Sequence, residues 1–307
     1  MEQIDELIRC YLRYLTILGR ARLTIRGARY GLMDFNRFLK EMNVACLSDL
    51  NQDVLFEYQQ ELAFRLTEKG TQLTLRSQGQ LLSVVKKFCC YLKRQDYLLS
   101  DPAEGIILPR KPKRLPRGIL DVAELKKLMA APDMQTNKGN RNRITLEILY
   151  DTGIRAAEMA AVKTCDLDLS SGYLTILSGK GAKDRVVPIS PRVCELIRRY
   201  ILMVRPVMVQ GKDKGYLILN RWGTKMTPQS VWAIVKRCAA LSGIKKNVTT
   251  HTFRHTCATD MLRNGAPIRH IQELLGHESL ESTQIYTRVT INDLKAIHAK
   301  YHPGEKL

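Results

Sequence analysis

The chain has 307 residues, enough for two domains with a full hydrophobic core in at least one of them. Its 49 Lys and Arg against 30 Asp and Glu give a net charge of +19, which favours a polyanionic partner, nucleic acid before an anionic membrane. No apolar run approaches the roughly 20 residues that a membrane span needs, and the first residues lack the basic and apolar start of a secretion signal. The eight cysteines form no C-x-x-C pair, so we expect reduced thiols in a cytoplasmic protein rather than a disulfide framework or a zinc ribbon.

Residues 1–108 predict an N-terminal helical domain. Apolar residues from Ile4 to Leu15 recur every three or four positions, which is typical of an amphipathic helix. Further helices are expected over roughly 24–42, 52–66 and 73–94, and Phe35, Phe38 and Leu39 should face inward. Several arginines crowd the first connection and the second helix, and they suit a DNA-facing surface as well as a solvated helix face. They are Arg20, Arg22, Arg26, Arg29 and Arg37.

Residues 109–117 are the predicted linker between two domains. Three prolines remove backbone donors and favour an extended chain. Five basic side chains with no acidic one suit contacts with a phosphate backbone, although a plain solvated linker has the same composition. The candidate DNA contacts here are Arg110, Lys111, Lys113 and Arg114.

The remaining residues, 118–307, predict a second domain of helices around a small β-hairpin. Helices are expected near 121–131, 144–150 (after a polar loop at 135–142), 191–204, 228–241, 251–265 and 292–300, with a short strand at 216–219. Gly153 permits a tight turn, after which Arg155 opens a new helix with Glu158 one turn later. Glu158 can brace the Arg155 guanidinium or simply favour the helix N-terminus.

Two strand-like segments, 173–177 and 185–189, predict the β-hairpin. Its tip carries Lys180 between two glycines, followed by Lys183. A lysine at a hairpin tip is most often simply exposed, but the flanking glycines would let this loop approach another backbone closely.

Six polar residues of this domain form a set suited to chemistry on a phosphate. They are Arg155, Lys180, His251, Arg254, His277 and Tyr286. Arginine supplies a permanent charge and a two-pronged donor that fits phosphate, whereas a phenol with a pKa of about 10 needs a base such as histidine to become a nucleophile. Taken singly, each of these residues is more often a structural or surface residue.

A metal is not expected in this site. His251 and His255 have the i, i+4 spacing of a zinc-binding helix, but Thr252 stands where the metalloprotease motif has glutamate. No phosphate-binding loop and no carboxylate cluster spaced for two metals occurs in the chain, so a covalent route without metal or other cofactor is favoured.

The same residues resemble the tyrosine recombinases, the family that includes the Xer proteins and the phage integrases. The resemblance covers the whole chain and rests on five motifs in one order: Thr152-Gly-Ile-Arg155-Ala-Ala-Glu158, Gly179-Lys180-Gly181, His251-Thr-Phe-Arg254-His255, Leu275-Gly-His277-Glu-Ser and Tyr286-Thr. It implies a mainly α fold with a small antiparallel sheet: an N-terminal SAM-like core-binding domain and an α+β catalytic domain, forming a C-shaped clamp on DNA.

The resemblance also implies roles for single residues. Tyr286 would attack the scissile phosphate to give a 3′-phosphotyrosyl link, while Arg155, Arg254 and His277 would hold its oxygens. Lys180 would protonate the leaving 5′-oxygen and His251 would act as the base toward Tyr286. Lys183 lies close to Lys180 in the sequence and is the alternative proton donor. Lys183 and Arg185 are also candidate DNA contacts.

By the same resemblance, four protomers would bind two duplex sites with inverted repeats, and a second recombinase or an accessory protein remains an open possibility. The last predicted helix, with Leu294 and Ile297, would dock on a neighbouring protomer or pack on its own domain. Three alternatives compete: a regulator of the same fold that cuts nothing, a type IB topoisomerase, and a metal-dependent hydrolase using His251, His255 and His277. The target sequence and the biological setting (chromosome dimer resolution, integration or transposition) do not follow from the sequence.

Overall fold

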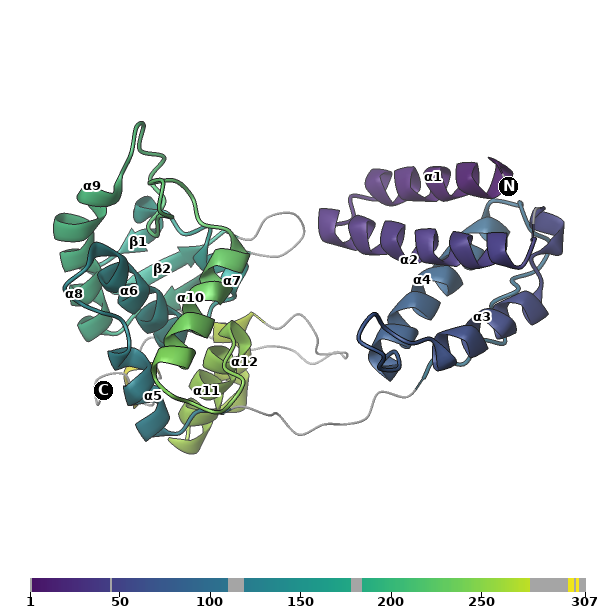
Figure 1. Ribbon diagram of the computed structural model, residues 1–307. Coiled ribbons are helices and arrows are strands. Elements are labelled where there is room, and N and C mark those ends of the chain that lie inside the picture. The colour runs from purple at the N-terminus through teal and green to yellow at the C-terminus, as the bar shows by residue number, and fades with distance from the viewer. Residues whose placement is uncertain are drawn as a thin grey trace. The chain divides into compact units, whose positions relative to one another are not determined.

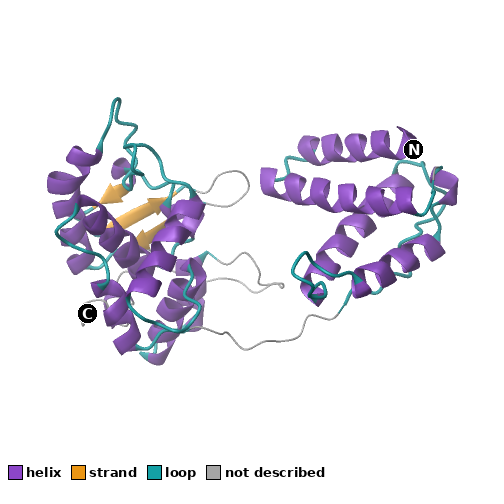
Figure 2. Cartoon of the chain, viewed as in Figure 1, coloured by secondary structure: helices purple, strands orange, loops and turns teal. Residues whose placement is uncertain are grey.

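The computed structural model describes residues 2–44, 46–109, 119–177, 184–276, 298–300 and 302–303. The chain forms two compact units, Met1–Arg114 and Leu115–Leu307 (Figure 1). Helices dominate both units, and the strands lie in the second unit (Figure 2). The expected mainly α fold with a small antiparallel sheet is therefore confirmed. No helix among the described residues is long and apolar enough to cross a membrane.

The first unit is a cluster of helices around an apolar core. The elements are α1 (Glu2–Ile17), α2 (Arg22–Glu41), the short 3-10 helix η1 (Leu47–Asp49), α3 (Gln52–Phe64) and α4 (Leu75–Arg94). Helices α3 and α4 begin where Asn51 and Thr74 accept hydrogen bonds from backbone N–H groups of the first turn. The residues predicted to face inward, Phe35, Phe38 and Leu39, are buried, as are the periodic apolar residues of α1. The sequence pattern thus located this core correctly.

The second unit places helices around a three-stranded sheet. The helices are α5 (Val122–Ala130), α6 (Asn137–Thr152), α7 (Ala156–Met159), the 3-10 helix η2 (Thr164–Asp166), α8 (Pro191–Arg199), the π-helix η3 (Tyr200–Val204), α9 (Arg205–Met208), α10 (Pro228–Leu241), α11 (Thr250–Arg263) and α12 (Ile268–Leu275). The antiparallel strands are β1 (Leu167–Asp168), β2 (Tyr173–Ile176) and β3 (Arg185–Pro188), in the order β1-β2-β3. The pairing of Ile176 with Arg185 closes the ladder between β2 and β3, which confirms the predicted hairpin strands.

Helix α6 is the central element of this unit and starts earlier than the sequence suggested. The polar segment 135–142 was expected to be a loop, but α6 begins at Asn137 because Thr136 caps the N–H of Gly139. Two polar residues of its first turns are buried: the Arg141 guanidinium donates to the Leu219 carbonyl at 3.1 Å and to the neighbouring Asn142 side chain. Buried polar residues give no apolar period, so the helix start could not be read from hydrophobicity.

Two other predictions of secondary structure need correction. The segment 216–219 is not a strand; Tyr216 and Leu219 make single bridges with Lys163 and Lys225. Each of these bridges involves a different partner segment, so no ladder can form. The helix expected over 191–204 is α-helical only to Arg199 and continues as the π-helix η3.

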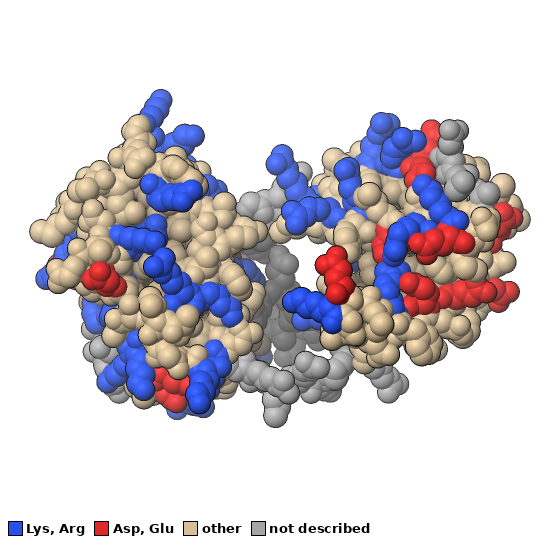
Figure 3. Space-filling view, in the orientation of Figure 1, with Lys and Arg blue, Asp and Glu red and all other residues tan. Residues whose placement is uncertain are grey.

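Positive charge is prominent on the second unit. Figure 3 shows many Lys and Arg side chains on the drawn face of this unit and few Asp or Glu. In the first unit, one of the crowded arginines, Arg37, forms ion pairs with Asp34 and Glu41 along its own helix. Residues 110–118, 178–183 and 277–297 lie outside the described residues. Most of the predicted linker (109–117), the hairpin tip and most of the last predicted helix are therefore not part of the description.

Candidate active site

The turn between α6 and α7 presents Arg155. Gly153 ends α6 with φ of +61°, a left-handed conformation that favours glycine, and the buried Ile154 fixes the chain after it. Arg155 is the N-cap of α7, and Glu158 reaches back to it: Oε2 accepts the Arg155 backbone N–H at 2.8 Å and Oε1 accepts Nη1 at 3.0 Å. The predicted bracing of Arg155 by Glu158 is therefore present.

Helix α11 presents His251 and Arg254. It begins at a capping box in which Thr249 and Thr252 each accept the other's backbone N–H. His251 and Arg254 are three residues apart and so share a face of the helix. The His251 side chain is exposed, whereas Arg254 is only 6% exposed and donates from Nη1 to the Gly153 carbonyl at 2.8 Å. Arg254 thereby connects α11 to the turn that carries Arg155.

Three arginines converge on the C-terminal end of α12. The helix ends at Gly276, which has φ of +62°, and its last carbonyls have no partner within the helix. Each of three successive carbonyls accepts a different arginine: Leu274 O from Arg185 Nε at 3.3 Å, Leu275 O from Arg254 Nη2, and Gly276 O from Arg155 Nη2 at 3.0 Å. The negative end of the helix dipole also favours cations at this place. The helix end thus gathers arginines from three distant segments directly before His277.

Glu158 is the shared acidic partner of this arginine group. Besides Arg155, it binds both terminal nitrogens of Arg185, with Nη1 to Oε1 at 2.9 Å and Nη2 to Oε2 at 2.8 Å. Burial alone would raise the pKa of Glu158, but the hydrogen bonds from Arg185 and Arg155 outweigh it and lower this pKa to about 2. The carboxylate is therefore charged at any physiological pH.

Burial and the positive charges of the site lower the pKa values of Arg254 and His251. Burial, reinforced by the charge of Arg155, lowers the pKa of Arg254 to about 10, so this guanidinium still carries its charge at neutral pH. Partial burial and the neighbouring charge of Arg254 also lower the pKa of His251 below its ordinary value of 6.5. The structure thus combines charged arginines with an imidazole that is neutral at pH 7.

This arrangement is suited to binding a tetrahedral oxyanion. A guanidinium has five N–H donors, and the carbonyls and Glu158 use only some of those on Arg155 and Arg254. The Arg155 side chain is 42% exposed and so remains reachable by a ligand. Because the two arginines bind consecutive carbonyls, they lie next to each other and can present two forks to one phosphate group.

Of the six predicted site residues, the structure brings Arg155 and Arg254 together, with His251 close enough for their charges to act on its pKa. Arg185, a candidate DNA contact, also lies in this group and binds Glu158 and the Leu274 carbonyl. The other candidate residues lie outside the described part of the chain. They are Lys180, His277 and Tyr286 among the proposed catalytic residues, and Arg110, Lys111, Lys113, Arg114 and Lys183 among the proposed DNA contacts.

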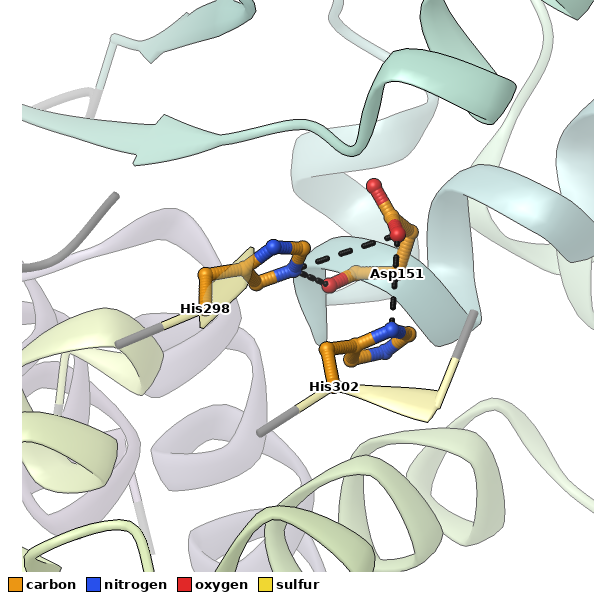
Figure 4. Close-up of side chains that lie close together, drawn as sticks. All are labelled: Asp151, His298 and His302. Atoms are coloured by element: carbon orange, nitrogen blue, oxygen red, sulfur yellow. Dashed lines mark hydrogen bonds and ion pairs between the residues drawn. The ribbon is translucent and has the colours of Figure 1, made fainter. Parts of the chain in front are cut away.

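A second polar cluster joins the C-terminal segment to α6 (Figure 4). His298 Nε2 lies 2.6 Å from the backbone oxygen of Asp151, and His302 Nε2 lies 3.0 Å from that of Tyr150. The Asp151 carboxylate lies 3.5 Å from His302 Nδ1 and accepts the Ser190 N–H at 2.8 Å. All three side chains are buried, and burial lowers the pKa of His302 to about 4.

These three residues offer ligand atoms within 4.8 Å of one another, the composition of a zinc site. The two imidazole rings, however, are stacked 4.6 Å apart and only 11° from parallel. A metal ion must lie close to the plane of each ring that ligates it, and no single point satisfies two stacked parallel rings. The cluster therefore acts as a hydrogen-bonded anchor that holds His298 and His302 on α6 of the same chain.

Sequence reasoning did not assign a role to Asp151, His298 or His302, nor the contact of Arg185 with Glu158. The four-residue spacing of His298, in the last predicted helix, and His302, two residues beyond its predicted end, was an available signal for a shared contact. The binding of Arg185 to Glu158 joins positions with no sequence relationship, so no local pattern could have indicated it.

The chain is similar to known proteins of one family. The phage integrase family matches residues 119–292. The tyrosine recombinase XerC 2 of Ralstonia nicotianae is 38% identical over 94% of this chain and 83% of its own length. The tyrosine recombinase XerD of Staphylococcus haemolyticus is 32% identical over 98% of this chain and 99% of its own length.

A crystal structure of the XerH site-specific recombinase bound to difH substrate, in a pre-cleavage complex, has the same fold. It has a TM-score of 0.67 and 21% identity over 99% of this chain and 82% of that chain. The two relatives at 32% and 38% identity, both named tyrosine recombinases, show that the chain is a protein of the tyrosine recombinase class. The chain belongs to the phage integrase family.

Proposed function

We propose that this protein is a site-specific DNA recombinase that cuts and rejoins strands through a covalent 3′-phosphotyrosyl intermediate. The observation that carries the proposal is the convergence of Arg155 and Arg254 on consecutive carbonyls directly before His277. Relatives at 31–38% identity over nearly the whole chain are named tyrosine recombinases, which supports the same reaction here.

In the proposed reaction, the phenol oxygen of Tyr286 attacks the scissile phosphorus while His251 accepts the phenol proton. Arg155, Arg254 and His277 stabilise the charge on the non-bridging oxygens, and Lys180 gives a proton to the leaving 5′-oxygen. One phosphodiester replaces another of similar energy, so neither a nucleotide nor a metal is required. Attack by a 5′-hydroxyl of the partner duplex reverses the step and joins two sites.

The proposed assembly is a tetramer on two duplex sites with inverted repeats, acting in the cytoplasm, and a second recombinase or an accessory protein is compatible with it. The net charge of +19 supports a DNA partner. Residues 1–108 would form the DNA-binding core-binding domain, residues 109–117 the linker and residues 118–307 the catalytic domain. The basic linker residues Arg110, Lys111, Lys113 and Arg114, with Lys183 of the hairpin tip, would contact the phosphate backbone.

Covalent trapping tests the proposal. The substrate is a nicked duplex carrying the repeats that flank the gene in its native replicon, so that the short cleaved strand diffuses away and the intermediate accumulates. With EDTA present, we expect a protein–DNA adduct that survives denaturation and disappears on protease digestion. A firm gel shift without any adduct, even after candidate partner recombinases are added, would instead favour a regulator that binds and does not cut.

The pH dependence of cleavage follows from the lowered pKa of His251. A base works when it is neutral, and the lowered pKa moves the protonation of His251 to a pH below its ordinary range. We therefore expect the single-turnover cleavage rate to hold between about pH 8 and 7 and to fall in more acidic solution, with a midpoint below the ordinary histidine pKa. His251→Gln should lower the plateau rate by about 100-fold or more and remove this acidic decline. An unchanged acidic decline in the variant would assign the titration to another group.

A further inference from the structure

Arg185 connects three segments of the proposed active site. It is the first residue of β3, the hairpin strand that follows the tip with Lys180 and Lys183 in the sequence. Its Nη1 and Nη2 bind the two oxygens of Glu158 in α7, and its Nε donates to the Leu274 carbonyl at the end of α12. One side chain therefore spans the hairpin, the turn of Arg155 and the helix end that precedes His277.

The helix end is shaped around this side chain. A Cβ added to Gly276 would lie 3.1 Å from Arg185 Nε and 3.2 Å from its Cδ and Cζ, closer than ordinary packing allows. Gly276 also has a φ of +62°. Glycine at this position thus lets the Arg185 side chain approach the backbone at the C-terminal end of α12 closely.

The environment of Arg185 differs from that of an arginine available to DNA. Its side chain is 14% exposed, whereas that of Arg155 is 42% exposed. All three of its guanidinium nitrogens bind protein oxygens, two of them in a bidentate pair with a carboxylate. A phosphate contact would require these charge-assisted bonds to break and would leave the part-buried Glu158 without half of its donors.

We propose that Arg185 is a positioning residue for the strand-transfer reaction, and not a contact to the DNA backbone. Through Glu158 it fixes the orientation of the Arg155 guanidinium, and through Leu274 it fixes the helix end that precedes His277. The effect on cleavage rests on the recombinase function proposed above; the absence of a DNA contact does not. This assignment replaces the sequence-based expectation that Arg185 binds DNA.

The Arg185→Gln variant distinguishes a positioning role of Arg185 from a contact with the DNA backbone. Loss of a positioning residue displaces Arg155 and the helix end, and a displacement of about 1 Å near a reacting centre can lower a rate by about 100-fold. We therefore expect the cleavage rate constant at saturating protein to fall about 100-fold, with DNA affinity within about twofold of wild type. A lost phosphate contact would instead weaken binding and reduce the slope of log affinity against log salt by about one.

The experiment measures equilibrium DNA binding over a range of salt concentrations and single-turnover cleavage of a nicked duplex, for wild type and three variants. Arg199→Gln is the matched control, since Arg199 is an exposed arginine of the same unit paired with Glu195. Arg185→Lys is the conservative variant: it keeps the charge but cannot bind Glu158 at two points and Leu274 at once, so it should recover only part of the rate. If Arg185→Gln unfolds at a much lower temperature than wild type, the comparison of cleavage rate and DNA affinity is made with Arg185→Lys in its place.

Reduced affinity with a smaller salt slope, together with a normal rate at saturation, would overturn the proposal, as would a normal rate and affinity in both Arg185 variants. If the wild type itself forms no adduct, the recombinase function fails. The salt slopes of wild type and Arg185→Gln then still decide whether Arg185 contacts DNA, since equal slopes support the inference and a slope smaller by about one contradicts it.

Discussion

Tyr286→Phe is expected to abolish strand cleavage and to leave DNA binding unchanged. The substitution removes one oxygen atom, the proposed nucleophile, and keeps the aromatic ring. Phenylalanine offers no atom that can attack the phosphorus in line with the leaving 5′-oxygen. We therefore expect no denaturation-resistant adduct on nicked DNA, while the gel shift on the same duplex keeps the wild-type midpoint.

A matched control is Tyr30→Phe, which makes the same change at an exposed tyrosine of α2 in the other unit. This variant should form the adduct at the wild-type rate. Peptide mapping of the wild-type adduct should then place the DNA on the peptide that contains Tyr286. Adduct formation by Tyr286→Phe, or mapping to another tyrosine, would assign the nucleophile elsewhere and would contradict the proposed mechanism.

The parts of the fold that depend on local pattern could be predicted from the sequence. The apolar period predicted α1 and α2 with buried residues of each, and the strand-like period on both sides of the glycine-rich tip predicted the two strands of the hairpin. Gly153 and the short spacing to Glu158 were enough to predict the turn and the bracing of Arg155, because both act within one helical turn.

The features that escaped prediction depend on contacts between distant segments. The carbonyls at the end of α12 that gather the arginines belong to the backbone, and a backbone acceptor has no signature in the sequence. Arg185 looked like any cation of a basic hairpin until its pairing with Glu158 was visible. The start of α6 escaped for a related reason, since Arg141 is polar yet buried, and only its long-range bond to Leu219 explains its position.

Substitution of Arg254 is expected to lower the cleavage rate more than substitution of Arg155 or Arg185. It is 6% exposed and connects two backbone carbonyls from different segments, those of Gly153 and Leu275. It therefore serves both the proposed charge stabilisation and the joining of the Arg155 turn to the end of α12. Removing one donor that stabilises developing negative charge typically lowers a rate by about 100- to 1,000-fold.

Arg254→Lys tests this expectation most directly, because lysine keeps the charge but lacks the planar fork that reaches both carbonyls. We expect its single-turnover cleavage rate at saturating DNA to fall at least about 100-fold.

The cleavage rate of Arg254→Gln should fall further, since this variant also loses the charge that Arg254 retains at neutral pH with a pKa of about 10. Two buried carbonyls also lose their donor in this variant, so its free energy of unfolding should decrease by roughly 1–3 kcal/mol. Thermal unfolding measured beside the cleavage assay separates this loss of stability from the loss of rate. If Arg254→Lys cleaves at the wild-type rate, a positive charge at this position is sufficient and the two-pronged binding by Arg254 is not needed for the reaction.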